Sequence, residues 1–233
     1  MIKAKILEIF QSIQGEGKYV GINQVFVRFF GCNMHCVWCD TPYSIGDSAK
    51  TTGKYKEYSI EQLFKEVKDS GKSCHSVSIT GGEPLLQAKF LKEFLPALRK
   101  NRIKVYLDSN GTLPAELKEL IDDIDIIAMD IKLPSSTEEK SFWKEHEEFL
   151  KVAVKKDVFI KTVVSSKTDK KDIMKAVNVV ASVDPNVLLI LQPNYFDMHN
   201  GVVKKCLEFE KECSKKLSNV RIIPQVHKFM KIR

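Results

Sequence analysis

The chain has 233 residues, of which 43% are hydrophobic and 29% are charged, and its formal net charge is +7. This length and composition predict one folded domain over residues 1–233 and exclude an intrinsically disordered chain. No apolar run is long enough for a transmembrane helix or a signal peptide, so we expect a cytoplasmic protein with no membrane partner. Lysines mix with acidic residues along the predicted helices. This distribution indicates solvated helix faces rather than a groove that binds nucleic acid.

The first two predicted elements are strands that lead into polar loops. Residues 3–10 alternate apolar and polar side chains, as a half-buried strand does, and the loop Gln14-Gly15-Glu16-Gly17 follows them. Residues 24–30 form a largely apolar run that ends at Gly31 and a cysteine-rich loop. The cysteine loop is therefore expected at the carboxyl end of a buried strand.

Strands and helices then alternate to the end of the chain. Ser59 and Gln62 predict a capping box that opens a helix at residue 60. Further strands are expected at 76–80, 103–107, 124–130, 158–164, 187–192 and 220–223, and further helices at 85–100, 114–121, 138–154, 170–181 and 202–217. This alternation predicts parallel strands joined by helical crossovers, an α/β fold. With about six parallel core strands, fewer than the eight of a closed barrel, we expect a partial, open β/α barrel.

Candidate functional residues follow several of these strands. In folds with parallel strands, reactive groups lie at the carboxyl ends of the strands. Cys32, Gly81, Asn110, Lys132 and Gln192 all fall at such ends. The pattern therefore predicts that these five residues share one site.

Three of the six cysteines, Cys32, Cys36 and Cys39, form a CxxxCxxC run. In a cytoplasmic chain such cysteines indicate metal binding or reactive thiols rather than disulfides. Structural zinc and iron-sulfur sites usually have four protein ligands. Three thiolates therefore favour an iron-sulfur cluster with one iron left open to a substrate or cosubstrate.

Two other interpretations of this run remain. A zinc knuckle would recruit His35 or a distant histidine as its fourth ligand, although no second cysteine pair follows. A redox dithiol would use Cys36 and Cys39 but leaves Cys32 unexplained. The remaining cysteines are scattered and are expected to be small buried side chains; they are Cys74, Cys206 and Cys213.

Arg28 is a charged residue inside the apolar run of residues 24–30. An unpaired guanidinium is costly to bury, and its planar geometry suits a carboxylate partner. That partner is either a bound carboxylate ligand or a carboxylate of the protein in a structural salt bridge.

The cysteine run, with Trp38 before its last cysteine, and the segment Gly81-Gly82-Glu83-Pro84 together resemble the radical S-adenosylmethionine (SAM) superfamily. The resemblance implies a 4Fe-4S cluster whose open iron chelates the methionine part of SAM. Reductive cleavage of SAM there yields a 5′-deoxyadenosyl radical.

Further motifs resemble one family of that superfamily, the 7-carboxy-7-deazaguanine synthases. They are Ser12-Ile13-Gln14-Gly15-Glu16-Gly17, Arg28-Phe29-Phe30-Gly31-Cys32-Asn33, Cys39-Asp40-Thr41, Thr80-Gly81-Gly82-Glu83-Pro84, Ser109-Asn110-Gly111-Thr112, Asp130-Ile131-Lys132 and Pro224-Gln225-Val226-His227-Lys228. The resemblance spans nearly the whole chain. It implies a carbon-nitrogen lyase that converts 6-carboxy-5,6,7,8-tetrahydropterin to 7-carboxy-7-deazaguanine with loss of ammonia, for queuosine or archaeosine modification of tRNA.

The resemblance also implies a role for individual residues. The cluster ligands would be Cys32, Cys36 and Cys39, and Thr41 would bind magnesium. Residues implied for SAM are Trp38, Gly81, Gly82, Glu83, Asn110, Asp130, Ile131, Lys132, Gln192 and Pro193. Residues implied for the substrate are Ile13, Gln14, Gly15, Arg28, Thr80, His227 and Arg233. Implied partners are a flavodoxin or ferredoxin electron donor and a second copy of the chain in a homodimer, with no direct contact to nucleic acid.

Without the resemblance, several of these residues have plainer interpretations. Gly81 and Gly82 would form an ordinary turn, Asn110 would be a turn residue, and Lys132 would be a solvated lysine at a strand end. Two other functions also fit parts of the sequence: a radical SAM activating enzyme that acts on a partner protein, and a non-enzymatic zinc or nucleic-acid-binding module. The loop at residues 14–17 and Arg28, which suit a small carboxylated pterin, favour the synthase.

Overall fold

The computed structural model describes residues 2–46, 55–71 and 73–232, and its centre is a nine-stranded sheet in the order β3-β1-β2-β4-β5-β6-β7-β8-β9. The strands are β1 (Ala4–Ile13), β2 (Asn23–Phe29), β3 (Lys56–Tyr58), β4 (Ser76–Gly81), β5 (Val105–Ser109), β6 (Ile126–Asp130), β7 (Asp157–Val164), β8 (Leu189–Pro193) and β9 (Val220–Ile222). The helices are α1 (Ile60–Ser70), α2 (Ala88–Lys100), α3 (Pro114–Leu120), α4 (Pro134–Thr137), α5 (Trp143–Ala153), α6 (Lys170–Val183), α7 (Val202–Cys213) and α8 (Val226–Met230).

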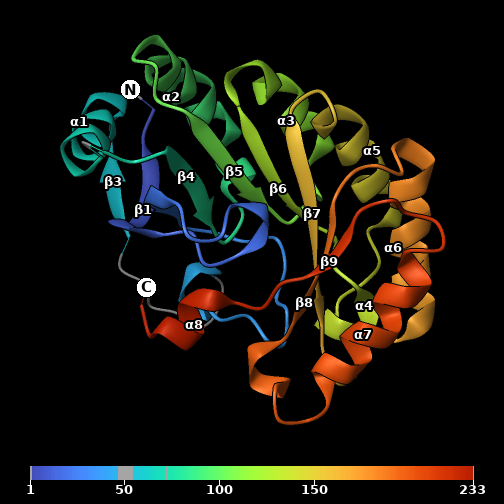
Figure 1. The fold of residues 1–233 in the computed structure, drawn as a ribbon. Helices are drawn as coiled ribbons and strands as arrows, with labels where there is room; N and C mark the ends of the chain where they lie inside the picture. Colours follow the sequence, from blue (N-terminus) through green and yellow to red (C-terminus); the bar gives the residue numbers. More distant parts are fainter. Residues whose placement is uncertain (1, 47–54, 72, 233) are drawn as a thin grey trace.

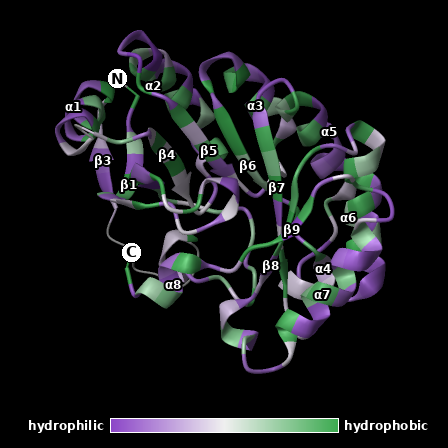
Figure 2. Cartoon of the chain, viewed as in Figure 1, coloured by the Kyte–Doolittle hydropathy of each residue, from purple (hydrophilic) through white to green (hydrophobic). Residues whose placement is uncertain are grey.

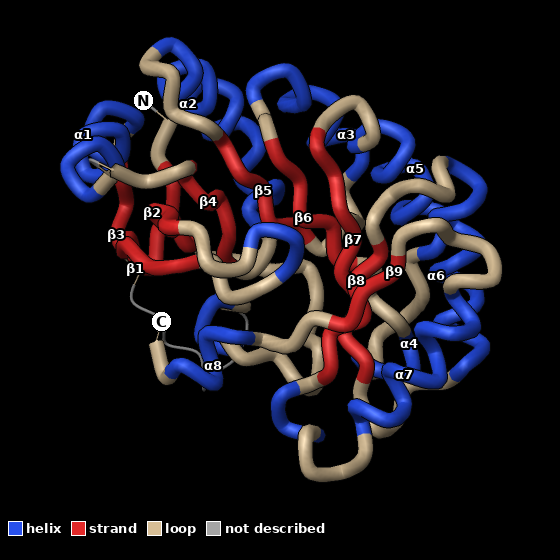
Figure 3. Tube along the Cα trace, in the orientation of Figure 1, coloured by secondary structure: helices blue, strands red, loops and turns tan. Residues whose placement is uncertain are grey.

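The sheet is mostly parallel and open. β2 and β4 to β9 pair in parallel, whereas β1 pairs antiparallel with both β2 and β3. The sheet curves with α1, α2, α3, α5, α6 and α7 along its outer side, while α8 lies at the opening beside the N-terminal loops (Figures 1 and 3). Since β3 and β9 are the two edges and do not pair, this is the open β/α barrel that the strand and helix pattern predicts.

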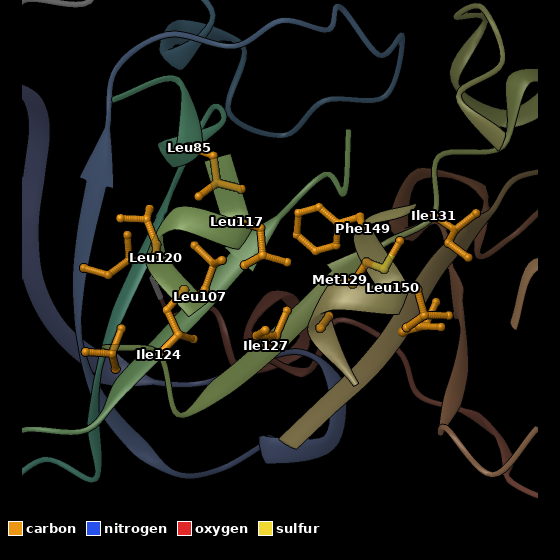
Figure 4. Packing of buried hydrophobic residues seen from close by; sticks show 14 of the residues in the cluster. Leu85, Leu107, Leu117, Leu120, Ile124, Ile127, Met129, Ile131, Phe149 and Leu150 are labelled. Atoms are coloured by element: carbon orange, nitrogen blue, oxygen red, sulfur yellow. The ribbon is translucent and has the colours of Figure 1, made fainter. Parts of the chain in front are cut away.

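The main core fills the space between the sheet and the outer helices. Apolar residues of the strands are green and the outward faces of the helices are largely purple in Figure 2. Figure 4 shows Leu107 and Ile127 of the sheet beside Leu117 of α3 and Phe149 of α5, and all four side chains are almost completely buried. Burial of this apolar surface is the main force that holds the helices on the sheet. Within the described residues, no helix is long and apolar enough to cross a membrane.

Several element boundaries differ from the prediction for local reasons. The predicted helix at 85–100 begins with a 3-10 turn at Pro84–Gln87. The one predicted at 138–154 begins only at Trp143, because Glu138 adopts the left-handed conformation, with a φ of 61°, as the cap that ends the short α4. The capping box at Ser59 is confirmed, with Gln62 donating and accepting the two expected bonds. The short elements β3 and α8 were not predicted, because three to five residues are too few to show a period.

The register of the parallel strands places polar side chains next to one another. Arg28 of β2 pairs with Thr80 of β4, and Asp130 of β6 pairs with Lys161 of β7. These residues are surrounded in sequence by apolar ones that form the barrel wall. The strands therefore present a row of polar groups to the inside of the open barrel.

Candidate functional site

A cavity of about 320 Å³ lies at the carboxyl ends of the strands. The strand ends, the cysteine loop and the C-terminal segment line it together. The predicted residues that line it are Ile13, Gln14, Gly15, Arg28, Cys32, Cys36, Trp38, Cys39, Thr41, Thr80, Gly81, Gly82, Asn110, Asp130, Lys132, Gln192 and His227. Three predicted residues, Glu83, Ile131 and Pro193, are not part of its lining, and Arg233 lies outside the described residues.

The three cysteines have free thiols and lie together at one side of this cavity. Among the described residues, the one group of potential metal ligands within 4.8 Å of one another is Glu16, Asp40 and His227, so the three sulfurs are spread more widely. A single zinc ion with bonds of about 2.3 Å to sulfur would need them closer. Sulfur ligands on three separate irons of a cluster lie further apart than the ligands of one zinc ion, so this spread does not oppose an iron-sulfur cluster.

Burial affects the protonation of these thiols. It raises the pKa of Cys32 to about 11 and also raises the pKa of Cys36, which Lys132 partly opposes. Without a cluster, both thiols are therefore protonated near neutral pH. Since the ligands of a cluster are thiolates, cluster assembly must release these protons.

Lys132 and Trp38 form the wall next to the cysteines. The ammonium of Lys132 lies 2.7 Å from Asp130 Oδ2 and 5.0 Å from the centre of the Trp38 ring. Trp38 is held by its indole N–H, which donates to the carbonyl oxygen of Ser136 at 2.7 Å. Burial disfavours the charge of Lys132, but Asp130 and Cys36 together keep the pKa of Lys132 above its usual range.

Two buried oxygen atoms in this wall lack partners. Among the described residues, Asp130 Oδ1 and Gln192 Oε1 have no hydrogen bond, although both side chains line the cavity. A buried acceptor without a donor costs about 1–3 kcal/mol. These atoms are therefore suited to accept hydrogen bonds from a ligand, such as those of hydroxyl or amino groups of a nucleoside.

The segment Gly81-Gly82-Glu83 packs against the start of the cysteine loop. A Cβ atom on Gly81 would lie 2.2 Å from the carbonyl oxygen of Phe29, and one on Gly82 would lie 2.2 Å from that of Gly31. The two glycines are therefore required for this close backbone approach. Glycine is therefore required at both positions for a structural reason. Both residues also line the cavity.

Glu83 is fully buried beneath this segment. Its carboxylate accepts hydrogen bonds from the N–H groups of Asn110 at 2.7 Å and Leu85 at 3.0 Å, and from the Ser109 hydroxyl at 3.1 Å. Burial raises its pKa to about 7. In this structure Glu83 therefore supports the turn at residues 109–112, and Ile131 likewise packs in the core rather than toward the cavity.

Arg28 is paired with a protein carboxylate and also faces the cavity. Its Nε lies 2.6 Å from Glu8 Oε1, so the structural salt bridge exists, and its guanidinium lies 5.8 Å from the centre of the Phe10 ring. Its two terminal nitrogens make no hydrogen bond to any residue that the structure describes. They remain able to bind a carboxylate in the cavity with two parallel hydrogen bonds.

A buried ion triad next to the loop at residues 14–17 was not predicted. Lys161 lies 2.8 Å from Glu16 Oε2 and 3.2 Å from Asp108 Oδ1, and its side chain is 6% exposed. Burial disfavours the charge of Lys161, but Asp108 and Glu16 raise its pKa well above the usual range. Burial also opposes the charge of Glu16, but Lys161 and Gln225 lower its pKa to about 2. The sequence contains one signal for this triad. Lys161 is a charged residue within the apolar run 158–164, as Arg28 is within its own strand, and a buried charge needs a partner.

The C-terminal segment closes the cavity on the same side. Gln225 donates to Glu16 at 2.8 Å, Lys228 lies 3.1 Å from Asp40, and the Val226 N–H donates to the Gly15 carbonyl at 2.9 Å. His227 packs directly on Gly15, where a Cβ would come within 2.1 Å of His227 Nδ1. These contacts hold the C-terminal segment against the loop at residues 14–17, and the two segments form one wall of the cavity.

Two further predicted residues, Gln14 and Thr41, make local contacts. The Gln14 amide donates to Gln24 at 3.0 Å and accepts from the Glu16 N–H at 3.0 Å, so it shapes the loop. The Thr41 hydroxyl lies 4.0 Å from the sulfur of Cys39 and 3.4 Å from Asp40 Oδ1. Thr41 lines the cavity beside Asp40, and magnesium binding there stays a prediction.

We expect the difference in stability between the cluster-free wild type and His146→Gln to shrink as the pH falls from 6.5 to 4. His146 is buried behind Asn110, and burial lowers its pKa to about 4. Below pH 6.5 the unfolded chain binds a proton at His146 that the folded chain does not bind, so acid removes stability from the wild type alone. Denaturant unfolding of both proteins at several pH values measures this difference, and a constant difference would contradict the expectation.

The chain is similar over its length to proteins of known function. A family model described as the radical SAM superfamily matches residues 26–181. The 7-carboxy-7-deazaguanine synthase of Geobacter sulfurreducens is 38% identical over 245 residues, which cover 97% of each chain. The protein of that name from Archaeoglobus fulgidus is 32% identical over 243 residues and covers 100% of both. The crystal structure of QueE from Escherichia coli has a TM-score of 0.65 at 23% identity, covers 97% of this chain and 96% of that chain, and shows the same fold.

Proposed function

Because the chain belongs to the 7-carboxy-7-deazaguanine synthase family of the radical SAM superfamily, we propose that it converts 6-carboxy-5,6,7,8-tetrahydropterin to 7-carboxy-7-deazaguanine with loss of ammonia. It is a radical SAM lyase of 7-deazapurine biosynthesis with a 4Fe-4S cluster and SAM as cofactors. When bound, the cluster and SAM supply the 5′-deoxyadenosyl radical that removes a hydrogen atom from the substrate.

One observation carries the proposal: a single cavity joins three free cysteines to an arginine that can bind a carboxylate. Glu8 fixes the orientation of Arg28, so its terminal nitrogens need no reorganisation to hold the 6-carboxylate of the pterin. The substrate then lies between Arg28 and the loop at residues 14–17, with Thr80 beside it. This placement brings the substrate and the cluster into one cavity.

The lining of the cavity supports the proposed cofactor and substrate residues, and the family resemblance supplies the magnesium ion, the electron donor and the homodimer. Cys32, Cys36 and Cys39 would hold the cluster. Trp38, Lys132 and the partnerless oxygens of Asp130 and Gln192 would bind SAM, together with the backbone of Gly81 and Gly82. His227 would complete the substrate pocket, and Thr41 would hold a magnesium ion that also takes oxygens from the substrate. A flavodoxin or ferredoxin would supply the electron, and the enzyme would act as a cytoplasmic homodimer.

The proposal is tested with anaerobically reconstituted protein, reductant, SAM and the carboxytetrahydropterin. We expect both 7-carboxy-7-deazaguanine and 5′-deoxyadenosine to form. Cleavage of SAM with no deazaguanine product would point instead to an activating enzyme for a partner protein. Zinc in place of iron after purification, with no charge-transfer absorption after reconstitution, would contradict the radical SAM assignment altogether.

Replacing Arg28 with alanine should lower the kcat/KM for the pterin by roughly 10²-fold to 10⁴-fold. The change removes a charge-assisted, two-bond contact, each bond of which contributes about 1.5–3 kcal/mol. The cluster should be retained, because Arg28 does not contact the cysteine loop in any described hydrogen bond. Arg99→Ala is the matched control, because Arg99 also pairs with a carboxylate, that of Asp123, but does not line the cavity. Loss of the cluster in Arg28→Ala would indicate a structural role for the ion pair with Glu8.

A further inference from the structure

We propose that Asn33, Asn110 and Thr112 form a hydrogen-bonded ring that positions the cysteine loop for the cluster. The inference rests on the proposed function, because it concerns the site of the cluster. Asn33 directly follows Cys32, whereas Asn110 and Thr112 belong to the turn after β5. The three are therefore positioning residues that act through the loop.

The ring is closed and runs in one direction. Asn110 Nδ2 donates to Asn33 Oδ1 at 2.8 Å, Asn33 Nδ2 donates to Thr112 Oγ1 at 2.8 Å, and Thr112 Oγ1 donates to Asn110 Oδ1 at 2.6 Å. The Thr112 N–H also donates to Asn110 Oδ1, at 3.1 Å. Hydrogen bonds joined in this way polarise one another, so the loss of one weakens the others.

Two buried residues hold the backbone of Asn110, one member of the ring. Glu83 accepts the Asn110 N–H at 2.7 Å, and His146 Nε2 donates to the Asn110 carbonyl oxygen at 3.2 Å. Both supporting side chains are fully buried, and Asn110 and Thr112 are 6% and 5% exposed. Asn33, by contrast, is exposed on its loop. The hydrogen bonds therefore connect a buried part of the core to the first half of the cysteine loop.

The ring also explains why the turn at residues 109–112 contains its particular residues. Gly111 has a φ of 69°, and a Cβ there would come within 3.0 Å of Met129. Ser109 donates to Glu83, so each polar group of the turn serves either the core or the ring. The side-chain amide of Asn110, which the family resemblance directs toward SAM, is here used to hold the cysteine loop.

The effect of such a ring should appear in cluster retention. Groups that orient metal ligands typically change metal affinity by 10-fold to 100-fold when they are removed. Without the ring, Cys32 would sample more positions, and the cluster would lose iron faster. The folded chain itself would still form, because Asn33 contributes little buried surface.

The test compares Thr112→Val, which removes the hydroxyl at nearly constant size, with Thr112→Ser, which keeps it. Reconstituted holoenzymes are mixed with an iron chelator under anaerobic conditions, and the rate of iron loss and the EPR signal of the reduced cluster are recorded. We expect about 10-fold faster iron loss from Thr112→Val and from the exposed variant Asn33→Ala, and near wild-type retention in Thr112→Ser.

Thr168→Val is the matched control, because Thr168 is a buried threonine whose hydroxyl accepts the Ser165 N–H at 2.7 Å outside the cavity. If Thr112→Val retains iron as well as Thr168→Val does, and Asn33→Ala retains it as well as wild type, the ring has no role in cluster binding. No pterin is present in this experiment. A failure of the proposed function would instead appear as absent deazaguanine product in a wild-type enzyme that holds its cluster.

Discussion

Replacing Cys36 with serine is expected to abolish formation of both 5′-deoxyadenosine and deazaguanine product. Serine is a poor ligand for iron in a cluster that thiolates hold, and the loop offers no fourth cysteine to take its place. Iron content and the charge-transfer absorption after reconstitution should fall together with activity. Iron content, absorption and activity are three independent measures of the loss of the cluster.

Cys74→Ser is the control for this change, because Cys74 is a free cysteine that does not line the cavity. It should retain wild-type iron content and full activity. If Cys36→Ser instead kept its iron and its product formation, the cysteine run would not be the cluster site. Equal losses in both variants would indicate a general effect of thiol removal on folding.

Lys161→Met is expected to lower the free energy of unfolding by about 3–5 kcal/mol and to reduce turnover of the pterin strongly. The variant leaves the carboxylates of Glu16 and Asp108 close together in a partly buried site without their shared cation. Glu16 would move from the C-terminal segment or take up a proton, and either change alters the wall of the substrate pocket. Denaturant unfolding of the cluster-free protein gives the first quantity, and steady-state kinetics give the second.

A second lysine provides the comparison for Lys161→Met. Lys18 pairs with Asp157 at 2.6 Å, but its side chain is 39% exposed, so Lys18→Met should cost no more than about 1 kcal/mol. The double variant Glu16→Gln with Lys161→Met should recover part of the lost stability, because it removes one of the two unpaired charges. Similar losses from Lys161→Met and Lys18→Met would show that the buried triad does not stabilise the fold.

Much of the fold was predictable, because most of the parallel strands are short apolar runs followed by a helix of amphipathic period. β4, β6 and β7 lie within one residue or two of their predicted bounds for this reason. The strand β3 and the helix α8 were missed, since they depend on contacts with β1 and with Gly15 rather than on their own sequence.

The residues of the site could be predicted where a short motif in the sequence contains the functional side chains. The cysteine run and Arg28 are recognisable from their neighbours in sequence, and the structure places both on the cavity. Lys161 was not recognised, and Gln225 was part of a motif but received no role, because both act through a pairing with Glu16 across 145 and 209 residues. The role of Glu83 also depends on a distant turn, which explains why its carboxylate points to Asn110 and not to the cavity.

The proposed function requires that the cavity bring C6 of a carboxytetrahydropterin next to the SAM that the cysteine loop and its cluster would hold. The most direct measurement uses substrate labelled with deuterium at C6 and follows the label by mass spectrometry. We expect deuterium in 5′-deoxyadenosine and 7-carboxy-7-deazaguanine as the product. Unlabelled 5′-deoxyadenosine formed together with the deazaguanine product would show that hydrogen is taken from elsewhere, and absence of that product would contradict the proposed function.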